Sequence, residues 1–520
     1  MERFPRSAAD AQQLLQLAEL FKQSAEIIAE EWNKEDFSRI KAETNSIKSN
    51  LGSLDTARIL PSPRLHEATR TVLAITGAAT ELVAEPYSRI QEVACQYFES
   101  RALFVAAERR IPDLLAGAGE YGLSVGEIAE ATGIEERKLS RILRCLCSIH
   151  IFRQIGTDRF ANNRISAALK NNEPLRAYVQ LFNLDIYTAS DQLPKYLLSS
   201  QGASYKVHET AWQKAVGTTK ARWDWLAERV SLDEVRPKEA PYPGLPDVRH
   251  LQPGPDGKYA RPELDNFGLA MVGGGKVSGA AHAYDFPWAS LGDALVVDVG
   301  GGVGGFVLQL LPAYPQLRYI VQDRAEVLQQ AQEEIWPVEA PEAVADGRVQ
   351  FMEHNFFQPN PVKGADVYWL RGIFYCVQIL SALRTSMAPT SRILVCDQVM
   401  NTTAGCDEIP PAPSPLPANY GYYMRYPHHR DLAMMSIING IERTPAQFTE
   451  LVKQAGLKVN KIWNCRSMVG IVEIGLKNEK DRHHRRLSYM GFGNYTQLGI
   501  GFFSSAKGPV RDELQADEQA

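Results

Sequence analysis

A glycine-rich loop between a buried strand and a helix is the first segment of this sequence that could hold a ligand. In "VVDVGGGVGGFVLQLL", Asp298 ends the expected strand, and Gly300, Gly302 and Gly305 lead into the expected helix. Glycines at such a turn can adopt positive φ and let a ligand approach the backbone. The spacing also satisfies the dinucleotide pattern G-x-G-x-x-G, so a nicotinamide enzyme and an S-adenosylmethionine enzyme both fit it.

The charge of Asp298 favours one of these two ligands. The acid stands two residues before the first glycine, where it would attract the cationic amino group of S-adenosylmethionine and repel a pyrophosphate. Asp323 closes the next expected strand in "IVQD" and is placed to bind ribose hydroxyls of either ligand. These residues favour S-adenosylmethionine without excluding a dinucleotide.

A second strand-to-helix junction lacks the loop at which chemistry is normally done. In "VYWLRGIFYCVQILSALRTSM", an apolar strand passes directly into an amphipathic helix at Phe374 and Tyr375. Such loops usually run about 2 to 6 residues, and open parallel sheets bind ligands just beyond the carboxyl ends of their strands. Phe374 and Tyr375 are also poor helix caps. We therefore predict a frayed helix start or a shortened strand at this junction.

Strands and helices alternate through the second half of the chain. The expected strands are "ALVVDVG", "RYIVQD", "VQFMEHN", "ADVYWLRGIF" and "SRILVCDQV", with helical patterns between them. Alternation of this kind predicts an α/β fold with a doubly wound, Rossmann-like parallel sheet.

The first half of the chain is helical. Residues 8–32 place apolar side chains at helical spacing and need a partner surface. Residues 124–163 have the pattern of a winged helix: a helix, a turn at Thr132 and Gly133, a second helix, and a hairpin around Gly156. A DNA-binding regulator would show salt-dependent affinity. The net charge of -5 and the mixed charges of the second helix favour a dimerisation or lid module instead.

Composition limits the classes of partner and compartment. A chain of 520 residues exceeds a single core, and 45% hydrophobic with 22% charged residues argues against wholesale disorder and against nucleic-acid binding. The seven cysteines lack paired metal spacing, so we expect reduced thiols, no metal and a cytoplasmic location. Neither a signal peptide nor an apolar run of membrane-spanning length is present, so no membrane partner is expected.

Changes in pattern divide the chain into five expected segments. They are a helical extension (1–65), a helical and winged-helix dimerisation domain (66–225), a Pro/Gly-rich linker or insertion (226–265), a cofactor-binding domain (266–476) and a poorly ordered tail (477–520).

Six blocks of the sequence carry a resemblance to one enzyme family. They are "DVGGGVGGF", "VQDRAEVLQQ", "FMEHNFFQP", "PVKGADVYWLR", "SRILVCDQVMN" and "RDLAMMSIINGIERT". From about residue 88 to residue 476 the chain resembles the plant caffeic-acid-type and fungal secondary-metabolism class I S-adenosylmethionine-dependent O-methyltransferases. The resemblance implies a homodimer that methylates a hydroxyl of a small phenolic or polyketide-type aromatic. The cofactor residues that it implies are Asp298, Gly300, Gly302, Asp323, Asn355, Phe356 and Arg371, with Asn355 standing where the family often has an acid.

By the same resemblance, the short junction lacks the family's general base. The fourth strand of the family typically ends Leu-Arg-x-Ile-Leu-His-Asp-Trp; here "LRGIF" matches the strand end and "YCVQIL" the next helix, so the His-Asp-Trp segment is absent between Phe374 and Tyr375. Asp397 and Glu442 match the two catalytic acids that flank the base. His428 and His429 could replace the base or simply be surface histidines. The substrate pocket is expected from "NYGYYMRY" and "LAMMSIING".

Loss of the base is expected to lower the rate of methyl transfer without necessarily abolishing the reaction. A phenol with a pKa near about 10 is mostly protonated at neutral pH, and a positioned histidine supplies about 10²- to 10⁴-fold. Alignment of the reactants can supply more, on the order of 7 to 11 kcal/mol. Two explanations stay open: a misassigned exon boundary, or a methylation-deficient homologue that keeps the cofactor as a scaffold or pericyclase-like catalyst. Formation of S-adenosylhomocysteine distinguishes a methyltransferase from such a homologue.

Overall fold

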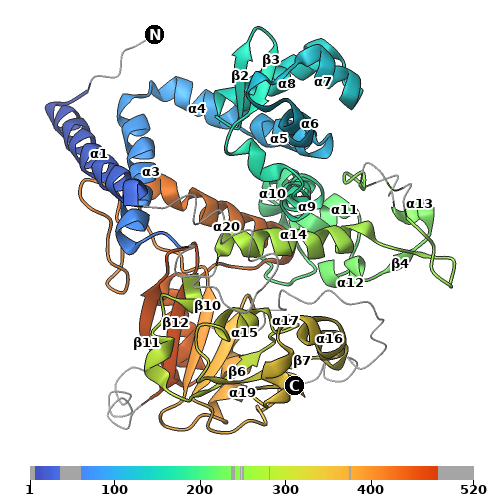
Figure 1. Ribbon diagram of the computed structural model, residues 1–520, viewed down its shortest axis with the longest axis vertical. Helices are drawn as coiled ribbons and strands as arrows, with labels where there is room; N and C mark the ends of the chain where they lie inside the picture. Colours follow the sequence, from blue (N-terminus) through green and yellow to red (C-terminus); the bar gives the residue numbers. More distant parts are fainter. Residues whose placement is uncertain are drawn as a thin grey trace. The chain divides into compact units, whose positions relative to one another are not determined.

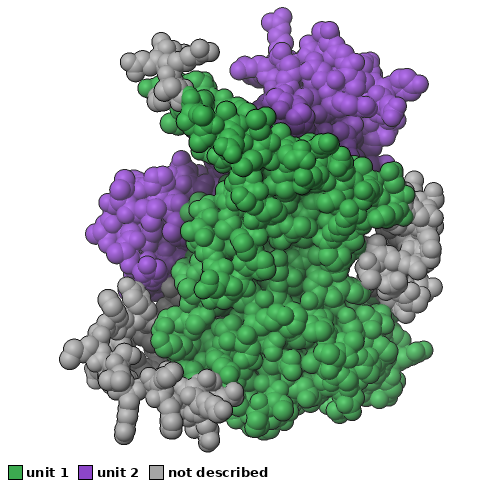
Figure 2. Space-filling view, turned by 90° about the vertical axis from the view of Figure 1, so that its left-hand side faces the viewer, with its two compact units in different colours: residues 1–93, 276–434, 440–503 green, residues 94–275, 435–439, 504–520 purple. Residues whose placement is uncertain are grey.

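The structure is a computed structural model that describes residues 6–34, 60–235, 240–245, 248, 251–279, 281–373 and 376–477. Beyond Lys477, the predicted C-terminal tail lies outside the described residues. Figure 2 shows two compact units in different colours. The first unit contains the described residues up to 93, those of 276–434 and those from 440 onward, and the second contains those of 94–275 and 435–439.

A seven-stranded sheet forms the centre of the first unit (Figure 1). Its strand order is β11-β12-β10-β9-β6-β7-β8. The five strands from β10 to β8 are parallel, and β12 is antiparallel to both β10 and β11. The strands are β6 (Leu295–Val299), β7 (Arg318–Asp323), β8 (Val349–Glu353), β9 (Val367–Arg371), β10 (Arg392–Asp397), β11 (Leu457–Asn464) and β12 (Gly470–Leu476).

This order confirms the predicted doubly wound sheet and places its switch point at β6. The chain proceeds from β6 to β7 and β8 on one side, then returns to β9 on the other side of β6. Open α/β sheets bind ligands at such a point, beyond the carboxyl ends of the strands. The glycine-rich loop that follows β6 therefore lies at the expected ligand site.

Helices and apolar cores cover both faces of the sheet. Tyr368 and Trp369 are consecutive in β9 and point to opposite faces, so each belongs to a different core. On one face, the rings of Phe306 and Trp369 stack with centroids 4.0 Å apart. The helices that connect its strands are α15 (Gly305–Leu310), α16 (Ala325–Gln330), the π-helix η7 (Ala331–Ile335), α17 (Trp336–Glu339), α18 (Pro341–Ala345), α19 (Val377–Arg384) and α21 (Pro445–Gln454). Between β10 and α21 the chain also forms η8 (Gly421–Met424), which contacts α3, and α20 (Arg425–Ile438).

Two N-terminal helices belong to the first unit as well. The expected helix over residues 8–32 is confirmed as α1 (Ala8–Lys34), and its partner is α3 (Pro63–Val83). Leu17 of α1 and Ile75 of α3 share a small core with Tyr420. Arg466, in the turn between β11 and β12, donates from Nη1 to the Pro61 carbonyl at 2.7 Å, which fixes the start of α3 to this turn. The helix α4 (Pro86–Cys95) follows α3.

The second unit contains the predicted winged helix. A capping box joins Ser124 and Glu127 at the start of its first helix, and Gly133 ends that helix at φ +70°. The elements are α5 (Tyr97–Glu108), α6 (Ile111–Ala118), β1 (Leu123–Ser124), α7 (Val125–Thr132), α8 (Glu136–Ser148), β2 (Phe152–Gly156) and β3 (Arg159–Asn162).

The rest of the second unit is mostly helical. Its elements are α9 (Glu173–Asn183), α10 (Asp185–Leu197), α11 (Ala211–Val216), α12 (Arg222–Leu226), β4 (Arg229–Val230), α13 (Leu232–Val235), β5 (Tyr259–Ala260) and α14 (Pro262–Ser278), the last of which runs into the first unit. Inside the segment with the linker-like composition, Tyr242 is fully buried and donates to Glu263 at 3.0 Å. Part of this segment therefore packs into the core of the second unit.

The short junction after β9 has the weak helix start that its sequence predicts. Strand β9 ends at Arg371, and α19 begins only at Val377. Cys376 is the N-cap and makes no side-chain capping hydrogen bond. Phe374 and Tyr375 themselves lie outside the described residues. Within the part of the chain that the structure describes, no helix combines the length and apolar character needed to span a bilayer.

Candidate functional site

The glycine loop after β6 is tied to the neighbouring strand β7 by backbone hydrogen bonds. Gly301 donates its N–H to the Gln322 carbonyl at 3.0 Å. Gly302 donates its N–H to Oδ2 of Asp323 at 2.8 Å. The loop is therefore fixed by the strand end that carries Asp323, and this carboxylate both shapes the loop and faces the same edge of the sheet.

Trp336 supports the loop from its other side. Its indole Nε1 donates to the Val303 carbonyl at 2.8 Å. Gly304 lies so close to this ring that a Cβ built on it would be 2.8 Å from the indole, and its φ is +87°. The position accepts only glycine without rearrangement.

Asp298 is a buried carboxyl with one oxygen left unpaired. The side chain is 2% exposed, and its Oδ2 has no hydrogen-bond partner among the described residues. Burial raises the pKa of Asp298 to about 7, while the charge of Arg371 opposes the rise and that of Asp323 adds to it. A buried polar atom without a partner is costly, and a cationic ligand group would satisfy it.

Arg371 lies near Asp298 and beside a buried histidine. Its Nη1 is 3.4 Å from Nε2 of His282. Burial, and then the charge of Arg371, lowers the pKa of His282 well below its ordinary value, so the imidazole is neutral. No local pattern in the sequence singles out His282, because a lone histidine among alanines carries no spacing signal.

Phe356 and Asn355 follow β8 and differ in their relation to the loop. A Cβ built on Gly300 would lie 3.4 Å from the Phe356 ring, so this ring borders the glycine loop. Asn355 is exposed, and its Oδ1 accepts a hydrogen bond from the Phe357 N–H at 3.1 Å. The structure thus groups six of the seven expected cofactor residues: Asp298, Gly300, Gly302, Asp323, Phe356 and Arg371.

These residues fit S-adenosylmethionine. The unpaired oxygen of Asp298 is available to an ammonium group, and each carboxylate oxygen of Asp323 accepts one backbone N–H and keeps lone pairs for ribose hydroxyls. Glycines allow the ligand to approach the backbone. Among the described residues, no group of three or more His, Cys, Asp or Glu side chains could hold a metal ion.

The expected acid pair comes together at the end of β10. Strand β10 ends at Asp397, and Val399 pairs as an isolated bridge with Arg443. The Met400 N–H also donates to the Arg443 carbonyl at 2.9 Å. Burial, and then the charge of Asp397, raises the pKa of Glu442 to about 8. One proton is therefore held near this pair at neutral pH.

The two histidines of α20 lie in a more exposed environment than the acid pair. Both His428 and His429 are exposed on this helix. This exposure is typical of surface histidines, while burial lowers the pKa of His429.

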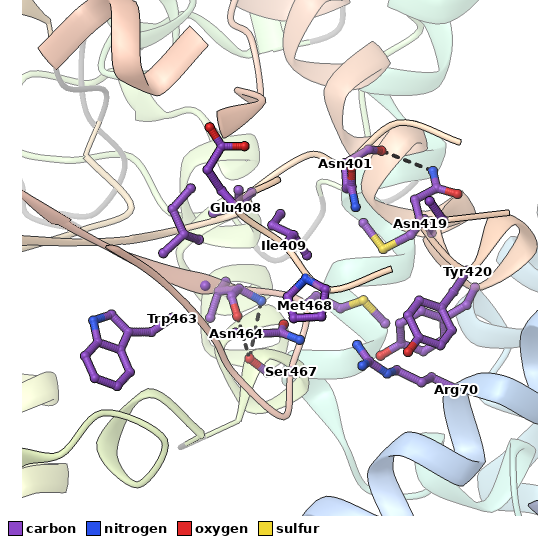
Figure 3. A pocket seen from close by; sticks show the side chains of 18 of the residues that line it. Arg70, Asn401, Glu408, Ile409, Asn419, Tyr420, Trp463, Asn464, Ser467 and Met468 are labelled. Carbon is purple, nitrogen blue, oxygen red and sulfur yellow. Dashed lines mark hydrogen bonds between the residues drawn. The ribbon is translucent and has the colours of Figure 1, made fainter. Parts of the chain in front are cut away.

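A cavity lies in the first unit beside the extension of β10 (Figure 3). It contains about 710 Å³ of space, part of which is open to solvent. Four residues of the expected pocket segment "NYGYYMRY" line it, and none from "LAMMSIING" does: Asn419, Tyr420, Tyr423 and Met424.

Replacing Gly301 with Ala should weaken S-adenosylhomocysteine binding by about tenfold. A Cβ at Gly301 would lie 2.5 Å from the Asp298 carboxyl, so that side chain must shift, and overpacking of this kind costs typically about 1–3 kcal/mol. Gly305→Ala is the matched control, since its Cβ would meet nothing within 4 Å. Calorimetric titration and thermal unfolding compare the two variants, and equal behaviour would contradict the close packing of Gly301 on Asp298.

Two family models match the chain. The model described as "O-methyltransferase domain" matches residues 282–458, and "O-methyltransferase dimerisation domain" matches residues 91–172. Among curated relatives, "O-methyltransferase tpcA" of Aspergillus fumigatus is 57% identical over 482 residues, which cover 91% of this chain and 98% of the relative. "O-methyltransferase gedA" of Aspergillus terreus is 56% identical over 483 residues, with 91% and 98% covered.

Solved structures share the fold. The mitomycin 7-O-methyltransferase MmcR is 25% identical, with a TM-score of 0.52, over 77% of this chain and 100% of that chain. A structure titled "A Pericyclic Reaction enzyme" is 21% identical, with a TM-score of 0.56, over 85% of this chain and 100% of that chain. The second likeness is one of fold alone.

Proposed function

The chain belongs to the S-adenosylmethionine-dependent O-methyltransferases, and from this premise we propose that it methylates a hydroxyl of a phenolic or polyketide-type aromatic in fungal secondary metabolism. The acid pair Asp397 and Glu442 carries the proposal, because Asp397 ends β10 and the glycine loop follows β6, both parallel strands of the same sheet, so the two lie at the same edge of that sheet. The names of the fungal relatives, which are O-methyltransferases, support the reaction class.

Three side chains would bind the cofactor around the glycine loop, and a fourth would act on one of them. Asp298 offers its unpaired oxygen to the amino group, and Asp323 offers lone pairs to the ribose. Phe356 offers a ring face beside Gly300. Arg371, whose charge acts on Asp298, limits how far the pKa of that carboxyl rises. When bound, S-adenosylmethionine supplies an electrophilic methyl group on a positively charged sulfur.

Glu442 is the proposed proton acceptor. The Glu442 carboxylate would take the proton of the phenol O–H, and the phenol oxygen would then accept the methyl group that the bound cofactor would supply. Asp397 assists through its charge, which raises the pKa of Glu442 toward that of the phenol. This assignment replaces the histidine that the family resemblance leads one to expect between Phe374 and Tyr375.

A methyl-transfer assay tests the proposed reaction. The full-length protein is incubated with trideuteromethyl-labelled S-adenosylmethionine and a panel of hydroxylated benzoates, naphthols and xanthones, and products are measured by mass spectrometry. We expect a labelled methyl ether and an equal amount of S-adenosylhomocysteine. Tight cofactor binding without S-adenosylhomocysteine on any acceptor would instead support the methylation-deficient alternative.

We also propose that the protein is a homodimer. The dimerisation model covers residues 91–172. Within the first unit, Ile90 and Val93 of α4 are 70% and 50% exposed, and α4 has no buried residue. Within the second unit, Phe98 of α5 is 58% exposed. Large apolar side chains that gather on exposed helices typically mark an interface.

Replacing Phe98 with Glu should convert the dimer to a monomer at micromolar concentration. A carboxylate buried in an apolar interface without a partner is strongly destabilising. Size-exclusion chromatography with light scattering measures the change. Leu198→Glu is the control, because Leu198 is 90% exposed and lies outside the matched dimerisation region. If the Phe98→Glu protein remains a dimer, α5 is not part of the dimer interface.

A further inference from the structure

The cavity of the first unit is assembled from four separate segments. It is walled by the first turns of α3, by the segment after β10, by the segment that leads into η8, and by the turn between β11 and β12. Neither Asp397 nor Glu442 lines it. The cavity is therefore a space distinct from the acid pair, although Val399 connects the two along the chain.

Aromatic side chains and one arginine shape the interior. Tyr420, Tyr423 and Trp463 are among the lining residues. The guanidinium carbon of Arg70 lies 4.0 Å from the centroid of the Tyr420 ring, and Nε donates to Glu67 at 2.7 Å. In Figure 3 the guanidinium group extends into the space between the walls. Arginine has five N–H donors, so those bound to neither Glu67 nor Tyr420 can serve a ligand.

Asn401 contributes a buried donor to the same space. Its side chain is 6% exposed, and its Oδ1 accepts the Thr402 N–H at 2.8 Å. Its backbone carbonyl accepts Nδ2 of Asn419 at 3.1 Å. The Nδ2 group of Asn401 donates to none of the residues that the structure describes, and in Figure 3 it points toward the interior. An unpaired amide N–H that faces the cavity from a mostly buried side chain favours a ligand oxygen.

The charges around the cavity nearly balance. Glu67 pairs with Arg70, and the exposed Glu408 stands at the rim. Burial, and then the charge of Arg70, lowers the pKa of His66, so its imidazole is neutral and offers one donor and one acceptor. The ligand thus needs an acceptor oxygen more than it needs a full negative charge.

We propose that this cavity binds a planar aromatic molecule that carries a carbonyl or carboxylate oxygen, at a site separate from the acid pair. The ring would pack against the faces and edges of Tyr420 and Tyr423. The oxygen would accept from Arg70 and Asn401, whose donors point into the same space. Because this site is separate from the one where the methyl group is transferred, such a compound should bind whether or not the methyl acceptor is present.

Isothermal titration of the full-length protein with salicylate tests the site. We expect one molecule bound per chain, with phenol about tenfold weaker because it lacks the acceptor oxygen. Arg70→Gln should weaken salicylate binding by about tenfold, and Met468→Trp, which fills the cavity from the turn between β11 and β12, should abolish it. Arg64→Gln is the matched control, since Arg64 lies on the same helix, pairs with Glu30 and does not line the cavity.

Two results would overturn the inference. If the Met468→Trp protein binds salicylate with wild-type affinity, the compound binds elsewhere. This variant leaves the ion pair of Arg70 and Glu67 intact, so its result is independent of any structural effect of Arg70→Gln. Competition between salicylate and the methyl acceptor, with a raised acceptor KM in Met468→Trp, would show that the cavity is the acceptor site itself. Unchanged acceptor KM with lost salicylate binding supports a separate site.

Discussion

Replacing Asp298 with Asn is expected to weaken S-adenosylhomocysteine binding by roughly 30-fold to several thousandfold. The proposed contact joins a buried carboxylate to the ligand's ammonium group, and removing one partner of such a pair costs about 2–5 kcal/mol. Asparagine keeps the shape of the side chain but not its charge. Calorimetric titration measures the loss, with Asp293→Asn as control, because Asp293 precedes the same strand and is exposed.

The same substitution is expected to make the ligand-free protein more stable. Burial raises the pKa of Asp298 to about 7 in the folded protein, against about 3.9 in an unfolded chain. The folded state therefore holds the proton of Asp298 more tightly than the unfolded chain does. The resulting loss of stability grows as the pH rises from about 4 to about 7 and is complete above pH 7. The penalty is on the order of 4 kcal/mol.

Urea unfolding at several pH values measures this effect. The Asp298→Asn protein should be more stable than the wild type at pH 8, and the difference should shrink toward pH 5. If the Asp298→Asn protein binds S-adenosylhomocysteine more weakly but unfolds at higher urea concentration than the wild type, the Asp298 carboxyl serves ligand binding and not stability. A variant that loses both stability and binding would show that Asp298 is structural and would contradict the assignment.

The second large effect is expected at the acid pair. Glu442→Gln should lower kcat by about 10²- to 10⁴-fold, the usual contribution of a positioned general base. The affinity for S-adenosylhomocysteine should stay within about twofold, because the proposed cofactor contacts lie on the glycine loop and the strand ends around it. Steady-state kinetics and calorimetric titration separate these two quantities.

Two further variants sharpen the result. Glu442→Asp keeps the carboxylate and should recover part of the lost rate. Glu450→Gln is the matched control, since Glu450 is an exposed residue of α21 that pairs with Lys453 at 3.6 Å. If Glu442→Gln keeps wild-type kcat on every acceptor that is methylated, the proposed proton transfer is wrong.

The fold was largely predictable because its signals are local. The unbroken apolar run "VYWL" of β9 is buried on both faces, which is the pattern of a central parallel strand. Gly133 and the hairpin at Gly156 likewise identify the winged helix. The hairpin of β11 and β12 was not predicted, because β11 alternates irregularly between partly buried and exposed residues and its register shifts after Val459.

The candidate site was predictable in part, for the same reason. Asp298 and the loop glycines are contiguous, so spacing alone marks a ligand site. Asp397 and Glu442 were predicted only from the family resemblance. A bridge between Val399 and Arg443 brings the two acids together, and no local sequence pattern predicts that bridge. The cavity of the first unit was anticipated only through the segment "NYGYYMRY", since its other polar residues, among them Arg70 and Asn401, stand on separate segments of the chain.

The pH dependence of methyl transfer tests the central assignment most directly. Single-turnover rates of the full-length protein are measured from pH 5 to pH 10 on an acceptor phenol that it methylates. Because Glu442 must be ionised to accept the proton, the rate should rise with pH around its pKa of about 8, and this rise should be absent in Glu442→Gln. A rise centred near 6.5, the ordinary pKa of histidine, that persists in Glu442→Gln would show that a histidine is the base and would contradict the acid pair.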